Sequence, residues 1–127
     1  MILLLDTSVL IDVLNGRKLR RRLLAEMLSQ NNTLATTAIN VAEIYAGMRD
    51  DESAQTSALL ADIHCYPITS AIAELAGRLK RDWARRGKTL QLPDLLIAAT
   101  ALEYDLTLLA DNRRDFPMVN LKLHPLT

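Results

Sequence analysis

The stretch MILLLDTSVLID at residues 1–12 decides the fold expected for this chain of 127 residues. Its apolar run at residues 2–5 is continuous rather than alternating, which is typical of a strand buried on both faces of a parallel sheet. Asp6 ends the run, and residues 9–14 follow a helical pattern that Thr7 or Ser8 can cap. A buried strand that leads directly into a helix predicts an α/β fold.

The same alternation of strands and helices continues along the rest of the chain. Helical periods are predicted at residues 18–30, 38–48, 53–62, 72–87 and 93–104, and strands at residues 33–37, 63–68, 106–110 and 121–123. This order predicts a mostly parallel central sheet of four to five strands, covered by helices on both faces in three α/β/α layers. The length predicts a single domain over residues 1–127.

Composition limits the classes of protein to which the chain can belong. Fifteen basic and fifteen acidic residues give a formal net charge of zero, so nucleic-acid binding must be argued from local patches. The single cysteine, Cys65, cannot form an internal disulfide, and its apolar neighbours predict a small core residue on a strand. There is no basic leader and no apolar run near the roughly 20 residues of a membrane span. A soluble cytoplasmic protein is therefore expected.

Acidic residues follow the predicted strands at points that a parallel sheet brings together. Asp6 ends the first strand, Glu43 lies in the helix after the second, Asp94 begins the helix at residue 93, and Asp111 closes the strand at 106–110. Open α/β sheets bind ligands at the carboxyl ends of their strands. We therefore expect these carboxylates to form a site at one edge of the sheet.

Each acid also has a structural explanation when it is taken alone. Asp6 can cap the first helix, Asn40 with Glu43 resembles a capping box, and Asp111 can be a turn residue. Asp94 falls in a first helical turn, where the helix dipole favours a carboxylate by roughly 0.3–1 kcal/mol. These explanations do not account for four charged acids at one edge of the sheet.

The combination of acids indicates a bound cation. Two carboxylates about 4 Å apart repel each other by about 4 kcal/mol at an effective dielectric constant near 20. A divalent ion offsets that repulsion, and ligands that are all oxygen favour Mg²⁺ or Mn²⁺. His64 and His124 are poorly placed to help, and no Ser/His/Asp or Cys/His arrangement is apparent. The residues alone therefore predict a metal-dependent hydrolase.

Three stretches in this order and spacing resemble PIN-domain ribonucleases, and within them the VapC-type toxins of VapBC toxin–antitoxin modules. The stretches are MILLLDTSVLID at residues 1–12, INVAEIYAGMR at 39–49 and LQLPDLLIAATALEYDLTLLADNRRDF at 90–116. The resemblance implies that Asp6, Glu43 and Asp94 are catalytic acids that hold the metal, with Thr7 and Ser8 in support. It leaves the fourth acid open between Asp111 and Asp115, with Asn112 as a neutral ligand or water-binder.

The resemblance also implies an activity and partners. It implies a Mg²⁺-dependent endoribonuclease, with Mn²⁺ able to substitute, that is the toxin of a type II toxin–antitoxin system and is inhibited by a cognate antitoxin. A homodimer that forms a higher assembly with the antitoxin is expected. Two alternatives stay open: a catalytically silent PIN-fold binding module that acts through protein or RNA, and a phosphotransfer enzyme with Asp6 as nucleophile. The second is disfavoured because Ser8 stands where such enzymes carry another Asp.

An acidic pocket repels RNA, so basic residues are expected around it. The RNA-binding candidates are Arg17, Lys18, Arg49, Arg113 and Arg114. The first two belong to a basic cluster at residues 17–22, and a second cluster occupies residues 78–88. The alternative is that both clusters are solvated helix faces.

Overall fold

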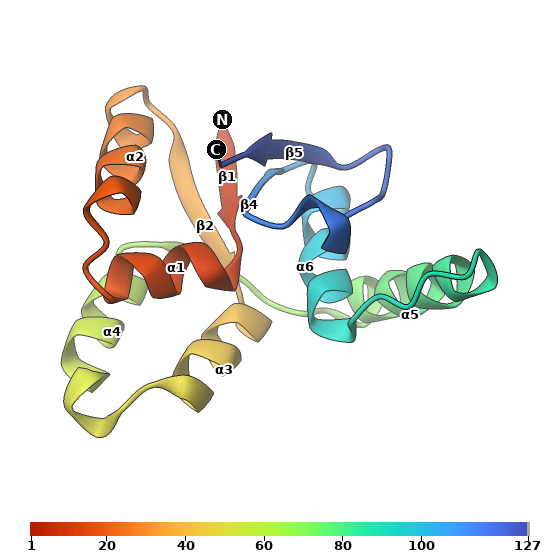
Figure 1. The fold of residues 1–127 in the computed structure, drawn as a ribbon, viewed down its shortest axis with the longest axis horizontal. Helices are drawn as coiled ribbons and strands as arrows, with labels where there is room; N and C mark the ends of the chain where they lie inside the picture. The colour runs from red at the N-terminus through yellow and green to blue at the C-terminus, as the bar shows by residue number, and fades with distance from the viewer. Residues whose placement is uncertain (127) are drawn as a thin grey trace.

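The computed structural model describes residues 1–126 and has a single five-stranded sheet at its centre (Figure 1). The strands are β1 (Ile2–Leu5), β2 (Thr33–Thr37), β3 (His64–Tyr66), β4 (Thr107–Ala110) and β5 (Lys122–Pro125). The helices are α1 (Thr7–Leu14), α2 (Lys18–Ser29), α3 (Ala38–Gly47), α4 (Ser53–Ala61), α5 (Ser70–Arg85) and α6 (Leu92–Glu103), with short 3₁₀ turns η1 (Asp50–Glu52) and η2 (Arg113–Asp115).

The sheet is parallel throughout, in the order β3-β2-β1-β4-β5. The first strand of the chain is therefore the central one, as its continuous apolar run predicts. Leu4 of β1 lies in register with Ala35 of β2 and with Leu108 of β4. Because all strands run the same way, their carboxyl ends meet at one edge, where the predicted acids follow them.

Two hydrophobic cores lie on opposite faces of the sheet. Successive residues of a strand point to opposite faces, so Leu3 and Leu5 pack with α1 and α2, whereas Leu4 packs with α5 and α6. Figure 1 shows the same division, with α1 and α2 on one side of the sheet and α5 and α6 on the other. α3 lies below the carboxyl edge and contacts both α1 and α6. The predicted three-layer α/β/α fold is confirmed.

Two expectations about local structure are wrong, and a choice between possible caps of the first helix is resolved. Cys65 is exposed rather than buried, because β3 is a three-residue edge strand that pairs only with β2 among the described strands. The first helix begins at Thr7, so Asp6 occupies the N-cap position instead of Thr7 or Ser8, although the Asp6 side chain makes no capping hydrogen bond. The predicted capping box of Asn40 and Glu43 is replaced by one between Thr37 and Asn40, because α3 begins at Ala38.

Among residues 1–126, no helix is both long enough and apolar enough to cross a bilayer.

Candidate active site

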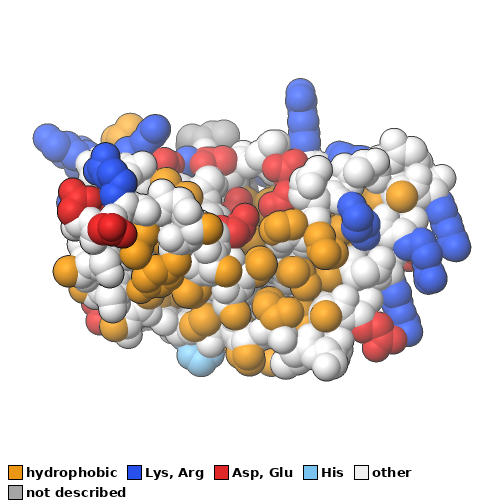
Figure 2. All heavy atoms as spheres, turned by 90° about the horizontal axis from the view of Figure 1, so that it is seen from below, with side chains coloured by type: hydrophobic (Ala, Val, Ile, Leu, Met, Phe, Trp, Pro, Cys, Tyr) orange, Lys and Arg blue, Asp and Glu red, His pale blue; other side chains and the backbone are white. Residues whose placement is uncertain are grey.

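Four carboxylates come together at the carboxyl edge of the sheet. Asp6 joins β1 to α1, Glu43 lies in the second turn of α3, Asp94 lies in the first turn of α6, and Asp115 ends η2 after β4. All four are partly buried. Figure 2 views the molecule from this edge and shows acidic side chains around a central hollow, with basic side chains at the margins.

The backbone fixes Asp6 at the centre of this edge. Its N–H donates to the carbonyl oxygen of Leu109 at 3.0 Å, which extends the β1–β4 pairing by one residue. Burial raises the pKa of Asp6 from 3.8 to about 6, and repulsion by Glu43 and Asp115 adds to the rise. The hydrogen bonds from the Thr7 backbone and the Ser8 hydroxyl oppose it only in part. Asp6 therefore lies in surroundings that disfavour its negative charge.

Asp94 is held in similar surroundings by α6. Pro93 lies at the start of the helix, where its missing N–H costs no hydrogen bond, and Asp94 follows in the first turn. Burial raises its pKa to about 6, and repulsion by Asp115, Asp6 and Glu43 contributes in that order. The two raised pKa values share these neighbours, so the four carboxylates form one electrostatic cluster.

The fourth acid of this cluster is Asp115 rather than Asp111. Asp115 raises the pKa of both Asp6 and Asp94. Asp111 instead forms an ion pair with Arg20 of α2, which lies 91 positions away in the sequence. The Asn112 side chain accepts a hydrogen bond from the Arg114 N–H at 3.1 Å and so caps η2.

Glu43 is oriented by a chain of hydrogen bonds that links three elements and is buried at its Thr37–Asn40 end. The Thr7 hydroxyl donates to Glu43 Oε1 at 2.8 Å, and Asn40 Nδ2 donates to the Thr7 hydroxyl at 2.8 Å. The Asn40 Oδ1 atom in turn accepts from the Thr37 N–H at 3.0 Å and from the Thr37 hydroxyl at 2.6 Å. Thr37 and Asn40 are both fully buried. The network fixes α3 to the start of α1 and holds the Glu43 carboxylate in place.

Asn40 and Thr37 are site residues that the sequence did not indicate beyond a possible cap. A buried Asn early in a helix must satisfy both its amide hydrogens and its carbonyl oxygen. That requirement is a signal for a network, although it does not identify the partners. Thr7, in contrast, was expected in a supporting role, and the structure gives it contacts to Asn40 and Glu43.

The five basic residues that are candidates for RNA binding lie in different surroundings. Arg49 lies 3.6 Å from Asp51 and 3.2 Å from Glu52, so it stabilises the η1 turn. Arg113 and Arg114 are exposed in η2, directly before Asp115. Arg17 and Lys18 lie at the start of α2 beside a cavity that contains Arg20.

The donor chemistry of the cluster fits a hard divalent cation. Within residues 1–126, no group of three or more His, Cys, Asp or Glu side chains is arranged so that it could hold a metal ion by itself. Mg²⁺ is usually bound by one or two carboxylates and keeps several waters, so it does not require such a cage. Asp6 and Asp94 are the residues that could hold it, because Glu43 and Asp115 both add to the repulsion at these two carboxylates. Because these acids repel one another, a cation would stabilise their charged forms.

The fold and this acidic edge define an α/β protein with a carboxylate site suited to a divalent cation. The family model for the PIN domain matches residues 3–120. The chain therefore belongs to the PIN-domain family.

Individual proteins extend this likeness over nearly the whole chain. Ribonuclease VapC19 of Mycobacterium tuberculosis is 35% identical over 115 residues, which cover 91% of this chain and 92% of that protein. The crystal structure of VapBC2 from Rickettsia felis, bound to a DNA fragment from their promoter, contains a chain with a TM-score of 0.86 and 25% identity, covering 100% of both chains. A toxin–antitoxin complex from Klebsiella pneumoniae gives a TM-score of 0.78 and 27% identity over 98% and 95% of the two chains. The VapC resemblance predicted from the sequence is confirmed.

Proposed function

We propose that this chain is a Mg²⁺- or Mn²⁺-dependent endoribonuclease and the toxin of a toxin–antitoxin pair. The observation that carries the proposal is the cluster of Asp6, Glu43, Asp94 and Asp115, in which burial and mutual repulsion raise two pKa values to about 6. The 35% identity to ribonuclease VapC19 supports RNA as the substrate. The likeness to a toxin–antitoxin complex supports a cognate antitoxin as the partner.

The side chains of the site would have distinct roles in phosphodiester hydrolysis. Asp6 and Asp94 would bind the metal ion, and Glu43 and Asp115 would hold its water ligands. A bound Mg²⁺ or Mn²⁺ supplies polarisation of the scissile phosphate and a lowered pKa for the attacking water. The Thr7 hydroxyl already donates to Glu43, so it keeps one carboxylate oxygen fixed and leaves the other free to accept from water. Ser8 does the same for Asp6 at a longer distance of 3.4 Å.

The site chemistry also supports the proposed inhibition by an antitoxin. An acidic hollow open at the sheet edge is complementary to a basic side chain from a partner, which would occupy the place of the metal and its substrate. We further propose that the active chain is a cytoplasmic homodimer of single-domain subunits. Light scattering of the purified chain, with and without the antitoxin encoded beside it, tests the assembly directly.

Cleavage of RNA by the purified chain tests the activity. We expect cleavage in Mg²⁺ or Mn²⁺, none after chelation, and none by Asp94→Asn, whose circular dichroism should match that of the parent. Full activity of Asp94→Asn, or activity in the presence of a chelator, would contradict the proposed metal site. Absence of any nuclease activity in the parent, together with tight partner binding, would favour the silent binding module.

A further inference from the structure

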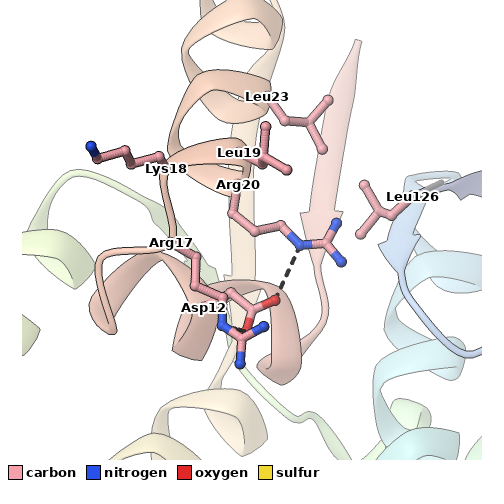
Figure 3. A pocket seen from close by; sticks show the side chains of 7 residues that line it. All are labelled: Asp12, Arg17, Lys18, Leu19, Arg20, Leu23 and Leu126. Atoms are coloured by element: carbon pink, nitrogen blue, oxygen red, sulfur yellow. Dashed lines mark hydrogen bonds and ion pairs between the residues drawn. The ribbon is translucent and has the colours of Figure 1, made fainter.

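A cavity of about 650 Å³ lies at the junction of α1, α2 and the end of the described chain. Figure 3 shows its lining, in which basic side chains meet apolar ones. The lining residues are Asp12, Arg17, Lys18, Leu19, Arg20, Leu23 and Leu126. The mixture suits a ligand that has both a negative charge and an apolar surface.

The basic residues of this cavity lie at the start of α2, where the helix dipole disfavours positive charge. The start of a helix carries partial positive charge, so an acid there is favourable and a basic residue is unfavourable by roughly 0.3–1 kcal/mol. α2 has no acid in its first turn and no side-chain cap, and five of residues 17–22 are basic. A bound anion would relieve this repulsion and contact the free N–H groups of the helix.

The basic side chains of the cavity differ in how firmly they are held. Arg20 is mostly buried and bridges Asp12, at 3.1 Å, and Asp111, so it forms a fixed wall. Arg17 pairs with Asp12 at 3.3 Å, yet 69% of its side chain is exposed. Lys18 extends outward from the rim in Figure 3 and forms no ion pair within residues 1–126. Arg17 and Lys18 are therefore available for a ligand.

The cavity is close enough to the acids to serve the same substrate. Asp12 follows Asp6 by six residues along α1, which corresponds to about 9 Å at a rise of 1.5 Å per residue. Asp111, the partner of Arg20, directly follows β4 at the same sheet edge. A short stretch of single-stranded RNA spans this distance.

We propose that this cavity is a subsite for the RNA chain next to the scissile phosphate. Arg17 and Lys18 bind a backbone phosphate, and Leu19, Leu23 and Leu126 contact the ribose and base of that nucleotide. Arg20 is a positioning residue that keeps the wall in place. This inference rests on the proposed ribonuclease function, and it assigns to α2 the selection of the substrate's flanking nucleotide.

The test uses a charge-removing double variant and a control at the opposite edge of the sheet. Arg17→Gln/Lys18→Gln removes two charges from the rim, and the control Lys122→Gln removes an exposed charge at the amino end of β5, outside both basic clusters. Each variant is placed in the Asp94→Asn background, and binding of a fluorescent RNA oligonucleotide is measured by anisotropy in Mg²⁺ at several salt concentrations. We expect about tenfold weaker binding for the rim variant and a salt slope smaller by roughly 0.7 per lost phosphate contact, with the control within about twofold of its parent.

Kinetics in the active background complete the test and separate the two proposals. The rim variant should raise KM for a long RNA and leave kcat near that of the parent. If the parent cleaves RNA but the rim variant binds RNA as the control does, the subsite is overturned while the nuclease proposal stands. If only binding of the partner protein weakens, the subsite is likewise overturned, because the cavity then binds protein. If the parent neither binds nor cleaves RNA, the proposed function fails and the subsite fails with it.

Discussion

The raised pKa of Asp6 predicts that its negative charge destabilises the metal-free protein. One pKa unit corresponds to about 1.4 kcal/mol, so a rise from 3.8 to about 6 corresponds to about 3 kcal/mol at pH 7. Because the folded state binds the proton more tightly than the unfolded state does, the destabilisation is absent below about pH 4, where Asp6 is protonated in both states. It develops as the pH rises and is complete above about pH 6. Solvent at the open edge screens part of the effect, so we expect about 2 kcal/mol.

Replacing Asp6 by Asn isolates this contribution, because an amide keeps the shape of the side chain and removes its charge. Urea unfolding in a chelator at pH 7.5 should give a free energy of unfolding about 2 kcal/mol higher for Asp6→Asn than for the parent. At pH 4 the difference should nearly vanish. Asp82→Asn, an exposed acid on α5, is the control and should give no such pH-dependent difference.

The same unfolding experiment can be repeated with Mg²⁺ in place of the chelator. Saturating Mg²⁺ should reverse the order of stability at pH 7.5, because the parent binds the ion and the variant loses a ligand. A ligand at 100 times its Kd stabilises the folded state by about 2.7 kcal/mol. Equal stability of Asp6→Asn and the parent in chelator at pH 7.5, or a difference that persists at pH 4, would refute the argument from burial and repulsion.

Three further results are expected. Asn40→Ala should lower the free energy of unfolding by about 1–3 kcal/mol in urea titrations, because it leaves the Thr37 N–H and hydroxyl unpaired. The variant should also lower kcat with little change in KM. An unchanged kcat would show that the network has no role in catalysis. Asp115→Asn should lose most RNA cleavage, whereas Asp111→Asn should keep it, and the reverse order would make Asp111 the fourth acid. In scanning calorimetry, Mg²⁺ should raise the Tm of the parent but not that of Asp94→Asn. An equal rise in both would show that the metal binds at a site without Asp94.

Local sequence was sufficient for most of the fold. The apolar run of β1 identified a strand that is buried on both faces, and each of the predicted helices appears within about two residues of its expected bounds. Cys65 shows the limit of such reasoning. Its neighbours resemble a core strand, yet its burial depends on the position of β3 in the sheet, and an edge position cannot be read from a short stretch.

Some residues of the site could be predicted from local sequence and others could not. The places of Asp6, Glu43 and Asp94 could be predicted, because each lies at or near the end of a strand or in a helix that the sequence predicts. The choice between Asp111 and Asp115 could not be predicted, because it depends on Arg20, which is 91 positions from Asp111. The role of Asn40 also depends on a distant partner, the Thr7 hydroxyl on α1. Local sequence patterns do not identify contacts between residues that are far apart in the sequence.

The ion pairs of Arg20 explain how one sheet edge keeps two regions of opposite charge apart. Opposite charges attract across a protein surface, so an arginine of α2 without a partner would be attracted toward the acidic cluster. Asp12 and Asp111 neutralise Arg20 and hold it between the two regions. With Arg20 held, the acids remain available for a cation and the rim of α2 remains available for an anion, as hydrolysis of an RNA backbone requires.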